Sequence, residues 1–106
     1  MKAVFIVLMD SEQVSAVMER MLEIGVKGAT VLNSRGMTGF LQDPPPFFSR
    51  IRHFTGSGVT DNQTIFTVVS ERGVKMVFDI VDEVTGGLSE NGAGIAFAVP
   101  VTDFRG

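Results

Sequence analysis

The stretch Ala-Val-Phe-Ile-Val-Leu-Met-Asp-Ser-Glu-Gln-Val (residues 3–14) decides the fold of this chain. Its apolar run, residues 3–9, is far shorter than the roughly 20 residues of a membrane span, so it predicts a buried β-strand. Asp10 or Ser11 can then supply the side-chain oxygen that caps a helix. Gly25 is placed to end that helix in a left-handed conformation. Its apolar residues have the i, i+3, i+4 spacing of one buried face: Val14, Val17, Met18, Met21 and Leu22.

A second short strand is expected at residues 28–34, and the same strand–helix–strand plan recurs in the second half of the chain. Residues 64–69 are β-branched and aromatic, which is typical of a strand. Ser70 can cap a helix that ends at Gly86-Gly87, and residues 94–101 form the last strand. Because each helix has one apolar face to bury, this order predicts an α+β, ferredoxin-like βαββαβ fold. Its four-stranded antiparallel sheet would carry both helices on one face.

The four expected strands are apolar at nearly every position rather than at every second one. Such strands are typical of a sheet that is buried on both faces. In the ferredoxin-like fold the helices cover one face, so a monomer would leave the other face in water. We therefore expect copies of the chain to associate by packing sheet against sheet.

Length and composition indicate a single domain over residues 1–106. The net charge is −3 and there is no cysteine, so neither nucleic-acid binding nor thiol chemistry is expected. The single histidine, His53, makes a His-rich metal site or a Ser–His–Asp triad hard to build. No nucleophile–base pair is recognisable, so we expect no enzymatic activity. The short N-terminal apolar run lacks a signal-peptide cleavage site, which predicts no membrane insertion and a cytoplasmic location.

A long loop at about residues 36–62 joins the two halves, where a connection of about 4–6 residues is usual. It contains Pro44-Pro45-Pro46 and is too rich in phenylalanine for a disordered tail. Its aromatic residues either contact a protein partner or pack on the chain itself: Phe47, Phe48 and Phe54. Its basic residues either bind phosphate or face solvent: Arg50 and Arg52.

Four glycine-centred segments stand out along the chain: Gly25-Val-Lys-Gly28-Ala-Thr30-Val, Gly36, Thr85-Gly86 and Gly92-Ala-Gly94-Ile-Ala-Phe-Ala-Val-Pro-Val. In order and spacing they resemble the nitrogen regulatory PII family and PII-like signalling proteins, over nearly the whole chain. The resemblance implies a homotrimer that binds a small anionic effector, an adenine nucleotide of the ATP, ADP or AMP type, in clefts between subunits. It also implies that the long loop relays effector binding to a target protein, such as a transporter or an enzyme.

The resemblance also assigns ligand-binding residues. Gly28 and Thr30 would face the base or the ribose, and Gly36 would begin the loop. Glycine lets backbone N–H groups approach a phosphate, so the phosphate side would be lined by three glycines: Gly86, Gly92 and Gly94. The loop would supply further ligand contacts: Thr38, Gly39, Arg50 and Arg52.

Three departures from the family pattern reduce the positive charge of such a site. Thr38 and Gly39 stand where the family has glycine and arginine, and Ile95 stands where it has a phosphate-binding lysine. The C-terminal basic pair of the family is also absent. We therefore expect ATP to bind weakly or not at all. The alternative is a structural or interaction trimer without a working ligand cleft. A copper-tolerance type trimer has little support without cysteines and with one histidine.

Overall fold

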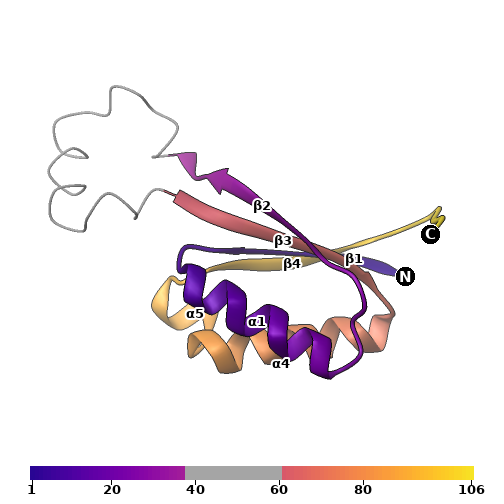
Figure 1. Cartoon of the computed structure of the whole chain (residues 1–106), viewed down its shortest axis with the longest axis horizontal. Helices are drawn as coiled ribbons and strands as arrows, with labels where there is room; N and C mark the ends of the chain where they lie inside the picture. The colour runs from indigo at the N-terminus through magenta and orange to yellow at the C-terminus, as the bar shows by residue number, and fades with distance from the viewer. Residues whose placement is uncertain (38–60) are drawn as a thin grey trace, which may run out of the picture.

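The computed structural model of the chain describes residues 1–37 and 61–106. The described helices and strands are, in chain order, β1 (Lys2–Leu8), α1 (Ser11–Glu23), β2 (Thr30–Arg35), β3 (Asp61–Val69), α4 (Glu71–Thr85), α5 (Leu88–Asn91) and β4 (Gly94–Pro100). The described termini, Met1 and Gly106, both lie at the same end of the molecule (Figure 1).

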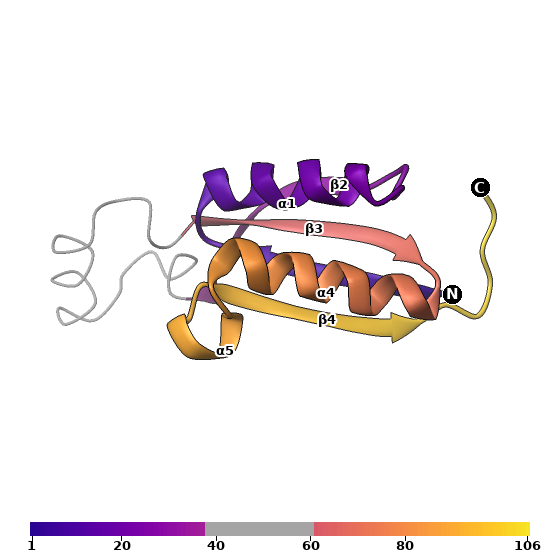
Figure 2. The same cartoon turned by 90° about the horizontal axis from the view of Figure 1, so that it is seen from below.

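The four strands form one sheet in the order β2-β3-β1-β4, and every neighbouring pair is antiparallel. The connection from β1 to β2 passes over β3, and the connection from β3 to β4 passes over β1. Helices α1 and α4 contact each other and lie on the same face of the sheet (Figures 1 and 2). The predicted α+β, ferredoxin-like βαββαβ fold with its antiparallel sheet is therefore confirmed.

The helix ends follow from side-chain and backbone hydrogen bonds. Asp10 is the N-cap of α1, where its carboxylate accepts from the N–H of Glu12 at 2.8 Å. Ser70 is the N-cap of α4, where its hydroxyl accepts from the N–H of Gly73 at 3.2 Å. Gly86 ends α4 in a left-handed conformation with a φ of 81°, as its position in the sequence predicts.

Several boundaries differ from the sequence-based expectation. Strand β3 begins at Asp61 instead of residue 64, because the polar residues 61–63 pair with β2 even though they lack the apolar pattern of a strand. Strand β2 begins at Thr30 instead of residue 28. The four-residue helix α5 was not expected, since it is too short to show a hydrophobic period.

The hydrophobic core lies between the sheet and the two long helices. Alternate residues of β1 point into it and are fully buried: Val4, Ile6 and Leu8. They pack with Ile65 of β3 and with the apolar faces of α1 and α4: Val14, Val17, Met21, Val77, Ile80 and Val81. The remaining residues of β1 therefore face the opposite side of the sheet, which no described helix covers (Figure 1).

This uncovered side of the sheet, which we call the open face, has a row of three phenylalanines across its middle. The strand register places Phe66, Phe5 and Phe97 side by side on β3, β1 and β4. The rings of Phe5 and Phe97 are stacked with centroids 5.1 Å apart, and those of Phe5 and Phe66 lie 6.1 Å apart. Further apolar side chains that flank this row are exposed: Leu32, Val68, Ile95 and Val99. The chain thus presents a continuous apolar surface on this side.

Within residues 1–37 and 61–106, no helix is both long enough and apolar enough to cross a membrane.

Candidate functional site

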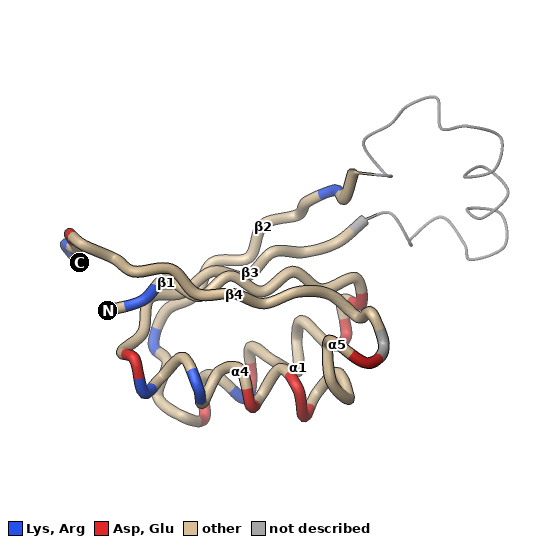
Figure 3. Tube along the Cα trace, turned by 180° about the vertical axis from the view of Figure 1, so that it is seen from behind, with Lys and Arg blue, Asp and Glu red and all other residues tan. Residues whose placement is uncertain are grey.

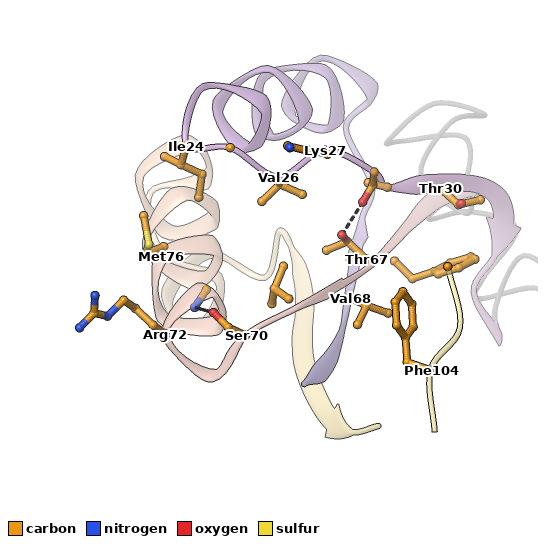
Figure 4. Close-up of a pocket in the computed structure, with 17 residues that line it drawn as sticks. Ile24, Val26, Lys27, Thr30, Thr67, Val68, Ser70, Arg72, Met76 and Phe104 are labelled. Atoms are coloured by element: carbon orange, nitrogen blue, oxygen red, sulfur yellow. Dashed lines mark hydrogen bonds between the residues drawn. The ribbon is translucent and has the colours of Figure 1, made fainter. Parts of the chain in front are cut away.

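A large hollow in the described part of the chain lies at the end of the molecule that carries both termini. It has a volume of about 910 Å³ and opens to solvent. The turn between α1 and β2 forms one wall, the end of β3 and the first turn of α4 form another, and the C-terminal segment closes a third side (Figure 4). Both Gly28 and Thr30, the predicted base or ribose contacts, line this hollow.

A partly buried hydrogen bond fixes the α1–β2 turn against the sheet. The hydroxyl of Thr67 donates to the backbone carbonyl of Gly28 at 2.6 Å, and Thr67 is only 3% exposed. At the start of the turn, the N–H of Val26 donates to the carbonyl of Met21 at 3.0 Å. Figure 4 shows the bond between Thr67 and the turn at the back of the hollow. Hydrogen bonds thus hold the α1–β2 turn at both ends. The position of this wall of the hollow is therefore set by the fold.

Apolar side chains form most of the hollow's surface. Phe66, Val68 and Phe104 lie on the side of the sheet, with Phe104 beside Val68, and Ile24 and Met76 lie on the side of the helices (Figure 4). Phe104 is 53% exposed, so one face of its ring is free to meet a ligand. A flat apolar group, such as a nucleobase, fits between surfaces of this kind.

Positive charge is present only at the rim of this hollow. Lys27 and Arg72 line it and are exposed, and neither forms an ion pair with another described residue. The side chain of Arg72 extends away from the centre of the hollow (Figure 4). Two rim cations can attract an anionic group, but they do not form the enclosed cage that a triphosphate requires.

The other predicted ligand residues lie at the opposite end of the sheet. Gly94 pairs with Leu8, at the end of β1 that is remote from the N-terminus. Gly36 follows the last residue of β2, whereas Thr30 is its first residue. Six steps along an extended strand span about 20 Å. A single copy of the chain therefore does not bring Thr30 and Gly36 together.

At three of the predicted ligand-binding positions, the fold alone explains why the residue is glycine. Gly86 and Gly92 end α4 and α5 with φ values of 81° and 65°, which side-chain-bearing residues rarely adopt. A Cβ on Gly94 would lie 1.9 Å from the carbonyl oxygen of Val7, which is closer than any contact allows. Their presence is thus explained with or without a ligand. By contrast, a Cβ on Gly28 would meet nothing within 4 Å.

Seven predicted site residues lie outside the described residues: Thr38, Gly39, Phe47, Phe48, Arg50, Arg52 and Phe54. The structure adds to the hollow residues that the sequence did not single out: Phe66, Thr67, Arg72 and Phe104. Thr67 and Phe66 look like ordinary strand residues in the sequence, and Arg72 like a solvated residue of a helix. Only the fold places them around Gly28 and Thr30.

No family model matches the chain, and no curated protein matches it. A function for the chain therefore rests on its own residues and geometry.

Proposed function

We propose that this protein is a PII-like regulatory subunit that assembles as a homotrimer and binds a small anionic effector in clefts between its copies. The long loop at about residues 36–62 would relay effector binding to a target protein. The observation that carries the proposal is the separation of the candidate ligand residues. Gly28 and Thr30 lie at one end of the sheet, and Gly36, Gly92 and Gly94 lie at the other.

A ring of copies would bring these two ends together. In a cyclic trimer each copy meets its neighbours through two different surfaces, so one end of a sheet can face the opposite end of the next. The open face supports such an assembly, because its apolar residues include Phe97, Ile95 and Val99, which are 45%, 59% and 39% exposed. Apolar surface of this extent is stabilised when a second copy covers it.

The hollow at the α1–β2 turn favours an effector of low charge. Its apolar walls suit a nucleobase, and its rim offers the two cations Lys27 and Arg72. At the opposite end, Ile95 occupies the place of a phosphate-binding lysine and is largely exposed. Each missing charged hydrogen bond lowers affinity by about 1.5–3 kcal/mol. We therefore expect an adenine nucleotide with one phosphate to bind better than ATP.

The proposal is tested by measuring mass and nucleotide binding on the same preparation. Light scattering at micromolar concentration should give the mass of three chains. A thermal-unfolding series with AMP, ADP and ATP should show the largest rise with AMP, because a ligand that binds only the folded state stabilises it in proportion to RT ln(1 + [L]/Kd). A monomer mass would contradict both the trimer and the shared cleft.

The alternative is a trimer with structural or interaction roles only. It is favoured by the fold-based reasons for Gly86, Gly92 and Gly94, which require no ligand. A mass of three chains together with no thermal response to any of the three nucleotides would favour this second function.

A further inference from the structure

A second hollow lies at the other end of the molecule, where β2 and β3 emerge from the sheet beside the start of α1. It has a volume of about 510 Å³. It is lined by Met9, Ser11, Asn33, Arg35 and Gln63, with Ser34 and Asn62 at its edge. The basic segment at the end of β2 in Figure 3 is Arg35. All these residues belong to one copy of the chain.

The lining of this second hollow is held in place by hydrogen bonds between β2 and β3. The Gln63 amide donates to the Asn33 side-chain oxygen at 3.1 Å. On the other side of the same two strands, the Ser34 hydroxyl bonds to the Asn62 side chain and lies 2.9 Å from the Thr64 hydroxyl. These contacts on both faces of the β2–β3 pair fix its register at this end of the sheet. The side chains that line the hollow are therefore arranged before any ligand binds.

The polar groups that remain without a partner here are mainly donors. Asn33 uses its oxygen to accept from Gln63, which leaves its NH2 group for a ligand. Arg35 makes no ion pair or side-chain hydrogen bond to another described residue. The N–H groups of its planar guanidinium are therefore free to donate hydrogen bonds to a ligand. Ser11 adds a hydroxyl at the first turn of α1. A hollow with several donors and one cation matches a ligand that has acceptor atoms and a single negative charge.

We propose that this hollow binds a small monocarboxylate, with Arg35 pairing with the carboxylate and Asn33 and Ser11 donating to its oxygens. Arginine is suited to this role because its two parallel N–H groups match the two oxygens of a carboxylate. A ligand with several negative charges is disfavoured by the neighbouring carboxylate of Asp10, which caps α1 through the N–H of Glu12. The site goes beyond the proposed function, because it lies within one chain and uses none of the residues assigned to the nucleotide.

The test is a titration of the full-length protein with sodium acetate, followed by amide NMR, with sodium phosphate as a parallel arm. Acetate should shift the backbone signals of Ser11, Asn33 and Arg35 and the side-chain amide signals of Asn33 and Gln63, with saturation. Arg35→Gln should weaken acetate binding about tenfold or more. Arg35→Lys should weaken it less, since the charge is kept but the paired N–H groups are lost.

Arg105→Gln is the matched control, because Arg105 is also an exposed arginine, forms no ion pair with another described residue, and lies at the opposite end of the molecule outside the lining of both hollows. It should leave the acetate titration unchanged. Equal weakening by Arg35→Gln and Arg105→Gln, or shifts spread evenly over all cationic residues, would overturn the proposal. Saturable binding of phosphate but not of acetate would overturn the carboxylate assignment. A monomer mass with intact acetate binding would contradict the trimer alone, so the two proposals fail separately.

Discussion

The hydroxyl of Thr67 and the carbonyl of Gly28 form a hydrogen bond of 2.6 Å that ties the α1–β2 turn to the C-terminal part of β3. The two residues are far apart in the sequence, and both line the larger hollow, Thr67 being buried and Gly28 exposed. It joins one residue that serves the fold to another that is a candidate ligand contact. A substitution of Thr67 therefore tests how much the hydrogen bond contributes to stability. A substitution of Gly28 tests whether this residue contributes to ligand binding.

Thr67→Val should destabilise the protein and loosen the turn. The substitution keeps the β-branched shape but removes the donor, which leaves the Gly28 carbonyl without its side-chain partner. The expected loss is about 1–3 kcal/mol in the free energy of unfolding, measured by urea denaturation. Thr102→Val, at an exposed position, is the control and should change stability by less than about 0.5 kcal/mol. Equal effects of the two changes would show that the hydrogen bond contributes little.

Alanine substitutions should separate the glycines that the fold requires from the one that it does not. Gly94→Ala should unfold the protein or cost several kcal/mol, because the new Cβ would lie 1.9 Å from the Val7 oxygen. Gly92→Ala should cost about 1–2 kcal/mol, because φ is 65° but the space is open. Gly28→Ala should leave the melting temperature nearly unchanged, since it has open space and no left-handed backbone. If Gly28→Ala keeps the fold yet abolishes the thermal response to AMP, the ligand assignment gains direct support.

Phe97→Glu should break the assembly without unfolding the chain. Phe97 is 45% exposed on the open face, so a carboxylate is tolerated in the single chain but not in a buried sheet-against-sheet contact. Light scattering should show a fall in mass, while circular dichroism should stay unchanged. Leu22→Glu is the matched control, because Leu22 is 69% exposed on α1 and lies away from the open face. An unchanged mass for Phe97→Glu would rule out the open face as the contact between copies.

ATP should bind with a dissociation constant weaker than about 1 μM. The physical reason is the small number of cations, since Lys27 and Arg72 are the only cations among the described residues that line the larger hollow, and the exposed Ile95 at the other end carries no charge. Isothermal calorimetry on the assembled protein measures this directly. Submicromolar binding would mean that other cations contribute, and Arg50→Gln and Arg52→Gln would then be the variants to measure first.

Removal of residues 40–58 should leave a folded protein of unchanged mass. The pairing of β2 with β3 runs from Thr30 and Phe66 to Arg35 and Asp61, and the deletion removes no core residue of the described ranges 1–37 and 61–106. The urea midpoint and the light-scattering mass should match those of the full chain. A deletion that abolished folding or assembly would show that the loop belongs to the core. That result would contradict the proposal that the loop relays effector binding to a target protein.

Much of the architecture was predicted from local signals alone. Asp10 and Ser70 cap their helices because a carboxylate or hydroxyl at these positions can reach a free N–H group within the first turn. Gly86 ends α4 for an equally local reason. The start of β3 was missed because residues 61–63 are polar, and they join the sheet through partners on β2 and, for Gln63, also on β1.

The sequence by itself determined the order of the strands and the two long helices, most of the apolar face of α1, and the presence of apolar residues on both faces of the sheet, because these depend on the spacing of neighbouring side chains. Leu22 was wrongly assigned to the buried face of α1, since it is 69% exposed. Tertiary structure alone decided which residues meet. It placed Phe104 and Arg72 around the same hollow as Gly28, stacked Phe5 on Phe97, and separated Thr30 from Gly36 by the length of β2. Contacts of this kind depend on strand order and register, which are fixed by long-range pairing and carry no local signal in the chain.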